Sequence, residues 1–247
     1  MSAEWLSAGA VRRGSAAGDG DELHVWHAVL GSGGAGDAAL LSADERERAE
    51  AFAWPELRRR WVWARATLRR VLAAYAELDP AALVFAYGEH GRPSLAGRSD
   101  LSFSLSHSDV RLVVVVARGR GRAVGVDVER VSRCAAPLAV AERFFAASEA
   151  ARLAALPAAG RAAAFAALWT AKEAYAKALG RGIGLPLSDC ALIGELTAPA
   201  LTRTAAVDPR GPDEWVLAQT APAPDYVCTA AVAGRRLVIV ERELTLH

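Results

Sequence analysis

LWTAKEAYAK, residues 168–177, lies inside an alanine-rich run, residues 161–179, that contains neither proline nor glycine. Alanine, leucine, lysine and glutamate all favour helix, and Gly180 directly after the run is a typical helix stop. We therefore predict one long helix here and place the remaining elements relative to it.

One face of this predicted helix carries groups that could do chemistry. Trp169, Glu173 and Lys177 are spaced four residues apart, so they lie along the same side. A lone glutamate and lysine at this spacing usually form a surface ion pair worth about 0.3–0.5 kcal/mol. The aromatic residues Trp169 and Tyr175 favour a partly buried setting instead.

A second group of acids lies in GVDVE, residues 125–129, where apolar and polar residues alternate as in a β-strand. Asp127 and Glu129 share one face of that strand, about 6.6 Å apart at their Cα atoms. Alternation alone indicates a solvated outer face. Gly125 favours the opposite interpretation, because a residue without a side chain leaves room for something to approach.

Asp127, Glu129 and Glu173 together would supply three hard oxygen ligands, a set that suits Mg²⁺. Mg²⁺ beside Lys177 and clustered arginines is typical of an enzyme that acts on phosphate esters. The residues alone leave two interpretations open, a metal-dependent phosphoryl-type enzyme and an ordinary solvated α/β domain.

Composition excludes several classes of protein. The 247 residues are 53% hydrophobic, enough for a substantial core, and the net charge of +1 provides no bulk field for nucleic acid or membrane. The three cysteines are far apart in sequence, which favours reduced thiols. Residues 1–20 lack the apolar stretch of a signal peptide, and the most apolar run, 112–117, is too short to span a bilayer. We expect a soluble, cytoplasmic protein.

The residue pattern divides the chain into a loose segment at 1–22, an N-terminal lobe at 23–121 and a C-terminal lobe at 122–247 that carries the metal site. A basic, glycine-rich link at 118–122 marks the boundary. The expected strands are 23–30, 83–87, 101–108, 111–117, 123–129, 215–219, 226–232 and 237–241, the last three as closing antiparallel strands. The expected helices are 42–52, opened by a capping box at Ser42 and Glu45, 56–77, 148–156 and 161–179. On the second of these we expect Arg60, Arg65 and Arg69 to extend over the surface.

Two motifs in this order carry a family resemblance. GVDVE, residues 125–129, followed about forty residues later by WTAKEAYAK, residues 169–177, resembles the 4′-phosphopantetheinyl transferases. The turn Gly91-Arg92-Pro93, the segment Ser104-Leu105-Ser106-His107-Ser108 and the arginine-rich helix around Arg60 extend the resemblance over most of the chain. Chain length and the link before Gly125 are similar to the monomeric, two-lobed, surfactin-type group.

The resemblance implies a mixed α+β fold of two pseudo-twofold-related lobes, each a small, mainly antiparallel sheet packed with helices. It also implies that coenzyme A, the co-substrate, binds between the lobes, with Mg²⁺ held against its pyrophosphate by Asp127, Glu129 and Glu173. The implied reaction moves the 4′-phosphopantetheine arm to a serine of an apo acyl or peptidyl carrier protein. The products are the holo-carrier protein and 3′,5′-ADP, and the enzyme is expected to be a monomer.

The resemblance also assigns roles to single residues. Glu173 is the candidate base, directly or through a water, and Lys177 would steady the charge on the phosphates. The residues that match positions contacting the coenzyme are Arg48, Arg60, Arg92, Ser106, His107, Lys172 and Lys177. The sequence departs from the family at Ser104, where relatives have asparagine, and at Glu45, a position that is often basic.

Two other functions remain as alternatives. A metal-dependent phosphodiester hydrolase would use the same acids but would need an activated water, and neither a histidine dyad nor a second acidic cluster is evident in the sequence. A non-catalytic domain that binds coenzyme A or carrier proteins would be indicated by a lost motif acid or lysine, and none is lost. The natural carrier protein, and whether Asp127 and Glu129 both ligate directly, stay open.

Overall fold

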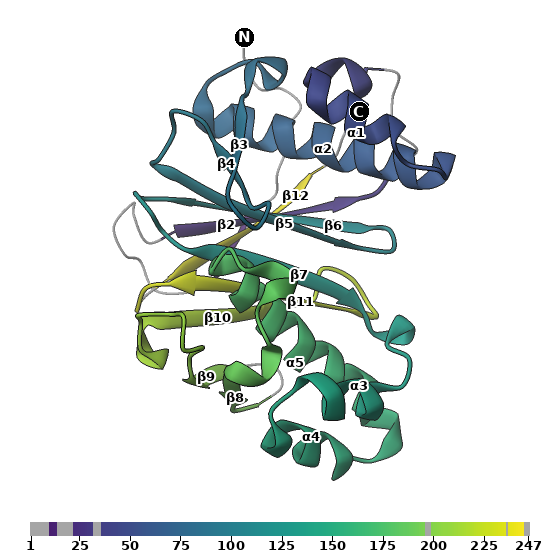
Figure 1. The fold of residues 1–247 in the computed structure, drawn as a ribbon, viewed down its shortest axis with the longest axis vertical. Coiled ribbons are helices and arrows are strands. Elements are labelled where there is room, and N and C mark those ends of the chain that lie inside the picture. The colour runs from purple at the N-terminus through teal and green to yellow at the C-terminus, as the bar shows by residue number, and fades with distance from the viewer. Residues whose placement is uncertain (1–9, 14–21, 32–35, 196–198, 236, 245–247) are drawn as a thin grey trace.

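Four layers, helix, sheet, sheet and helix, make up this computed structural model, which describes residues 10–13, 22–31, 36–195, 199–235 and 237–244 (Figure 1). The five helices are α1 (Ala43–Glu50), α2 (Pro55–Ala76), α3 (Pro137–Phe144), α4 (Ala147–Ala154) and α5 (Ala158–Ala178) in the described ranges. The predicted mixed α+β fold with small, mostly antiparallel sheets is confirmed.

Two main sheets lie face to face. The first contains, in spatial order, β1 (Ala10–Arg13), β12 (Val238–Leu244), β2 (Glu22–Val29), β6 (Arg111–Arg118) and β5 (Leu101–Ser108). The second contains β10 (Trp215–Thr220), β11 (Tyr226–Ala233) and β7 (Val124–Arg130). Two hairpins flank them, β3 (Phe85–Tyr87) with β4 (Pro93–Leu95), and β8 (Ala191–Ile193) with β9 (Ala200–Arg203).

Side-chain alternation along the strands explains the layers. On β6, Val114 and Val116 pack in the core beneath α2, whereas Val113 and Val115 belong to the core between the two sheets. A strand that is buried on both faces reads as a continuous apolar run, as β6 does. The second sheet buries its outer face under α5, so α2 and α5 cover opposite sides of the molecule (Figure 1).

Two strands do not follow the expected lobe boundaries. β12, expected as an antiparallel closing strand of the C-terminal lobe, lies in the first sheet, parallel to β2 and antiparallel to β1. β1 itself falls within the segment 1–22 that was expected to be loose. Val238, Ile239 and Val240 are all buried, which is the pattern of a central strand covered on both faces. The strand expected at 237–241 is therefore present and antiparallel to β1, but it lies in the first sheet and not in the C-terminal lobe.

The arginines of α2 also differ from expectation. Arg65 and Arg69 were expected to extend over the surface, but both are buried. Each donates to the buried carboxylate of Glu45, Arg65 Nε at 2.8 Å and Arg69 Nε at 2.7 Å. Glu45 also accepts from the backbone N–H of Ser42 as the predicted capping box requires, so this acid joins α1 to α2.

Candidate active site

The acidic face of β7 packs against α5 and not against water. A Cβ added at Gly125 would lie 2.0 Å from the carbonyl oxygen of Ala174 and 2.5 Å from the backbone nitrogen of Ala178, both on α5. Only glycine therefore allows this helix to approach the strand so closely. The space beside the acids admits α5 itself, and the side chain of Asp127 is buried as a result. The interpretation of a solvated outer face was wrong.

This approach brings α5, β7 and β5 together at one cluster of polar side chains. Lys177 Nζ lies 2.7 Å from Asp127 Oδ1 and donates to Ser106 Oγ at 3.1 Å. Ser106 Oγ donates to the same Asp127 oxygen at 2.8 Å. The other oxygen of Asp127, Oδ2, is buried without a hydrogen-bond partner. Buried polar atoms are normally satisfied, so this atom suggests a ligand.

The two remaining acids of the predicted metal site have raised pKa values. Burial is the main cause for both, and the negative charge of Asp127 adds to it. The charge of Lys177 acts in the opposite direction on both acids, and a hydrogen bond from Ser108 does so on Glu129. Carboxylates that disfavour one another's ionisation, beside a buried oxygen without a partner, form a donor set that fits a divalent cation. Within the described ranges, no three His, Cys, Asp or Glu side chains already stand in a metal-binding arrangement.

The predicted coenzyme-binding residues of the first half lie at different places. His107 is exposed at the end of β5, and its pKa is lowered, first by loss of hydration and then by the positive charges of Lys177 and Arg60. Arg60 is partly exposed on α2, with Nε 3.0 Å from Glu56 Oε1. Arg48 is exposed in the last turn of α1, and its contact with the coenzyme stays a prediction.

Arg92 connects the two halves of the molecule. Its Nη1 donates to the carbonyl oxygen of Ala178 at 2.6 Å, and its Nη2 to that of Val124 at 3.1 Å. Burial lowers the pKa of this guanidinium. Of the carboxylates in the described part of the chain, none is recorded within ion-pair distance of Arg92. A half-buried cation without an acidic partner favours an anionic ligand.

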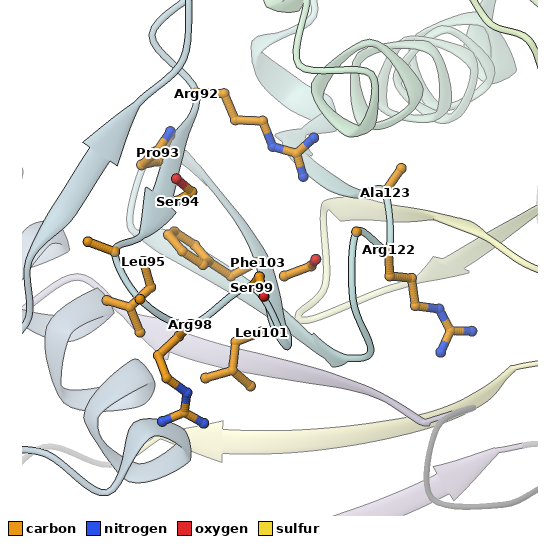
Figure 2. A pocket seen from close by; sticks show the side chains of 14 residues that line it. Arg92, Pro93, Ser94, Leu95, Arg98, Ser99, Leu101, Phe103, Arg122 and Ala123 are labelled. Atoms are coloured by element: carbon orange, nitrogen blue, oxygen red, sulfur yellow. The ribbon is translucent and has the colours of Figure 1, made fainter.

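Two pockets border Arg92. The smaller, of about 190 Å³, also exposes Lys177, Gly180 and Gly182. The larger, of about 590 Å³, lies along β4 and the start of β5 (Figure 2). In Figure 2 the Arg92 side chain extends away from Pro93 and towards Ala123, so its guanidinium lies at the junction of the halves.

Lys172 does not lie at this site. Its side chain is fully buried, with Nζ 2.8 Å from Glu149 Oε2 and hydrogen bonds to the carbonyl oxygens of Leu187 at 2.8 Å and Cys190 at 2.7 Å. Lys172 is one residue before Glu173, about 100° around the helix, and so points into the C-terminal core. The prediction that Lys172 binds the coenzyme was wrong.

The sequence interpretation assigned no role to Ser108, which the structure places against the predicted metal ligands. Its Oγ lies 2.8 Å from Glu129 Oε2. The signal was present in the regular spacing of Ser104, Ser106 and Ser108, which sets all three on one side of a strand.

A buried carboxylate paired with lysine, between two halves of the molecule and with Arg92 nearby, is an arrangement that enzymes of phosphate esters use. Residues 123–231 match the 4′-phosphopantetheinyl transferase superfamily. The chain is 35% identical over 220 residues to the 4′-phosphopantetheinyl transferase HetI of Nostoc sp. (strain PCC 7120), covering 87% of this chain and 89% of that protein. The chain therefore belongs to the 4′-phosphopantetheinyl transferase superfamily.

Two further relatives agree with this assignment. The 4′-phosphopantetheinyl transferase psf-1 of Bacillus pumilus is 31% identical over 181 residues, 69% of this chain and 76% of that protein. The transferase Sfp of Bacillus subtilis (strain 168) is 28% identical over 149 residues, 60% of this chain and 64% of that protein. The holo-[acyl-carrier-protein] synthase of Thermotoga maritima shares 24% identity over 46% of this chain and 64% of that chain, with a TM-score of 0.36, and no conclusion rests on it.

The predicted family, its surfactin-type group and the predicted activity are confirmed. The protein is an enzyme that transfers a 4′-phosphopantetheine arm to a carrier protein, and neither the hydrolase nor the non-catalytic domain is favoured. In the part of the chain that the structure describes, no helix is both long enough and apolar enough to cross a bilayer.

Proposed function

We propose that this chain takes the phosphopantetheine arm from coenzyme A and attaches it to a serine of an apo acyl or peptidyl carrier protein, releasing 3′,5′-ADP. Asp127, Glu129 and Glu173 hold Mg²⁺ in this proposal. The contact between Lys177 Nζ and Asp127 Oδ1 at 2.7 Å carries it, because it places a lysine cation against the buried acid whose negative charge also acts on Glu129 and Glu173.

Mg²⁺, when bound, neutralises negative charge on the pyrophosphate and on the three carboxylates. The buried Asp127 Oδ2 supports this donor set, since it has no hydrogen-bond partner from the protein. The raised pKa values of Glu129 and Glu173 support it as well, because a cation relieves the repulsion that contributes to them. Lys177 pairs with Asp127 in this structure. With the charge of Asp127 neutralised by a cation, Lys177 would be free to contact the phosphate oxygens.

Glu173 is the proposed base. Glu173 would act directly or through a water, and it lies on the face of α5 that also carries Lys177. The carrier serine oxygen attacks the phosphorus atom that bears the pantetheine, the bond from that phosphorus to the oxygen of 3′,5′-ADP breaks, and Glu173 takes the serine proton. Lys177 stabilises the negative charge that develops on the phosphate oxygens.

The phosphates of coenzyme A bind between the halves in this proposal. Arg92 supplies a half-buried cation, while His107 and Arg60 supply positive or polar contacts from the first half. Ser106 offers its hydroxyl group from β5, and Arg48 contributes from α1. Charge-assisted hydrogen bonds of this kind favour phosphate binding.

We propose that the enzyme acts as a monomer in the cytoplasm. Both sides of the site come from one chain, His107 from β5 and Lys177 from α5, so a second copy is not needed to complete it. The three cysteines are free thiols, which fits a reducing compartment.

Incubation of the protein with coenzyme A, Mg²⁺ and an apo carrier protein tests the proposal, with the mass of the carrier as the readout. We expect the carrier to gain one phosphopantetheine arm and the reaction to stop when EDTA removes the metal. A carrier of unchanged mass would contradict the transfer, and full conversion in EDTA would contradict the metal.

A further inference from the structure

The edges of the two main sheets meet along a line of serines. β5 is the last strand of the first sheet, and β7 is the last strand of the second. Ser104, Ser106 and Ser108 occupy alternate positions on β5, and each contacts β7 through its hydroxyl group. Hydroxyl groups here replace the backbone ladder that would join two strands of one sheet.

The three hydroxyls have different partners. Ser104 Oγ accepts from the backbone nitrogen of Val126 at 3.2 Å. Ser106 belongs to the Lys177 and Asp127 cluster already described. Ser108 Oγ donates to Glu129 Oε2 at 2.8 Å and accepts from the backbone nitrogen of Arg130 at 3.2 Å.

The pair of bonds at Ser108 determines where its proton points. A serine hydroxyl has one proton and two acceptor positions. The backbone N–H of Arg130 engages the acceptor side, so the single proton is directed at Glu129 Oε2. Ser108 is buried, and water therefore competes little for that carboxylate oxygen.

We infer that Ser108 is a positioning residue, which holds the Glu129 carboxylate in the orientation that Mg²⁺ binding requires. The inference rests on the proposed metal site. Groups that hydrogen-bond to metal ligands orient them, and losing one typically lowers metal affinity about 10–100-fold. Ser104 belongs to the same line of serines, but its hydroxyl contacts only backbone. A substitution at Ser104 therefore tests whether a serine hydroxyl that merely joins the two sheets affects metal binding.

Mn²⁺, used in place of Mg²⁺, tests the inference without any turnover, because bound and free Mn²⁺ are distinguished by electron paramagnetic resonance. We expect Ser108→Ala to bind Mn²⁺ about 10–100-fold more weakly than the wild type. The matched control Ser104→Ala should keep wild-type affinity, and Ser108→Thr, which retains the hydroxyl, should restore most of it. If Ser108→Ala does not fold, Ser108→Cys, a weaker donor, should show the same direction.

Each other outcome overturns the inference. Mn²⁺ affinity within about twofold of wild type in Ser108→Ala means that Glu129 needs no orientation by this serine. An equal loss in Ser104→Ala means that the serines only join the sheets. If the wild type itself fails to bind Mn²⁺, the proposed metal site is wrong, and the role of Ser108 is wrong with it. Wild-type binding with no effect of Ser108→Ala leaves the metal site intact.

Discussion

Asp127 carries an electrostatic cost that a bound cation would remove. One of its oxygens receives bonds from Lys177 and Ser106, while the other is buried without a partner. An unsatisfied buried polar atom costs about 1–3 kcal/mol. Enzymes commonly accept such costs where catalysis needs a charged group away from water. At the scale of single residues, the site is therefore less stable than it could be.

Two substitutions on α5 separate the metal from the phosphates. Glu173→Gln removes a proposed ligand and the base, whereas Lys177→Ala removes the charge that steadies the phosphates. We expect each to lower carrier modification about 10²–10³-fold. Only Glu173→Gln should weaken metal binding, because Lys177→Ala also releases Asp127 Oδ1 from its ion pair. Near-wild-type conversion of the carrier by Glu173→Gln would remove this residue from the mechanism.

The raised pKa of Glu173 predicts a pH-dependent stability difference. An unfolded glutamate titrates near pH 4.3. Because the folded pKa is higher, the carboxyl destabilises the fold as pH rises from the unfolded pKa through the folded one. In EDTA, Glu173→Gln should therefore match the wild-type Tm near pH 4.5 and exceed it at pH 8. The Tm should rise by about 2–4 °C for each kcal/mol of unfolding free energy that the charged carboxylate costs the wild type. The same Tm difference between Glu173→Gln and the wild type at both pH values would contradict the raised pKa of Glu173.

Which residues form the site was predictable in part. The motifs single out Asp127, Glu129, Glu173 and Lys177, and the structure pairs the first with the last. Lys172 was misplaced, because a linear motif does not say which side of a helix faces the cleft. The neighbouring core decides that, and Glu149 holds Lys172 there.

The packing of α5 on β7 depends on one residue without a side chain. In Gly125→Ala, the new Cβ would collide with the backbone of Ala174 and Ala178. We expect a loss of unfolding free energy of about 1–3 kcal/mol or more, because overpacking forces the backbone to shift. Activity should fall as well, since α5 carries Glu173.

Gly160→Ala is the matched control for that experiment. Gly160 lies in the first turn of the same helix, and a Cβ there has nothing within 4 Å. Alanine is favoured over glycine in a helix by up to about 1 kcal/mol, so this variant should be slightly stabilised. Chemical denaturation of both variants measures the difference in their unfolding free energies. Equal stability of Gly125→Ala and Gly160→Ala would mean that the strand and helix tolerate separation.

Lys172 anchors α5 to α4 and to the segment after α5. Lys172→Met removes one partner of a buried ion pair and leaves Glu149 uncompensated, which typically costs about 3–5 kcal/mol. The KM for coenzyme A should remain unchanged in protein that still folds. The double variant Lys172→Met with Glu149→Gln should recover part of the lost stability. A raised KM without loss of stability would return Lys172 to the coenzyme site.

Most elements follow from local pattern, and the exceptions share a cause. The apolar periodicity of α2, the alanine-rich run of α5 without proline or an internal break, and the alternation of β5 and β7 predict those elements directly. α3 and the hairpin of β8 with β9 were not predicted, because short elements carry few periodic residues. The buried arginines of α2 required the partner Glu45, which is distant in sequence.

At the scale of the whole molecule, strand order is the part that sequence pattern leaves undetermined. β12 has the apolar run of a central strand, but that run does not say which sheet receives it. It crosses back from the second half and lies between β1 and β2. The two halves are thus joined by a shared strand, by the core between the sheets and by the serines of β5. Such long-range pairings depend on the packing of the complete chain.

Arg92 is a further connection between the halves, beside pairs such as Arg130 with Asp109, and it is expected to serve the coenzyme as well. Arg92→Ala removes a half-buried cation and two hydrogen bonds to carbonyl oxygens of the second half. Loss of a charged contact costs about 1.5–3 kcal/mol, so calorimetry should show coenzyme A binding roughly 10–150-fold more weakly. The Tm should fall as well. Arg92→Lys keeps the charge but lacks the fork that reaches both carbonyls. It should retain more of the affinity than Arg92→Ala while losing similar stability.

Arg98→Ala is the control, because Arg98 lines the same larger pocket but is paired with Asp100 at 2.9 Å. Its guanidinium also donates to the carbonyl oxygen of Ala76, so the variant should lose some stability and keep its affinity for coenzyme A. Unchanged affinity for coenzyme A in Arg92→Ala would mean that Arg92 only connects the two halves and does not bind the coenzyme. An equal loss of affinity in Arg98→Ala would instead mean that any damage near this pocket weakens binding, whichever charge is removed.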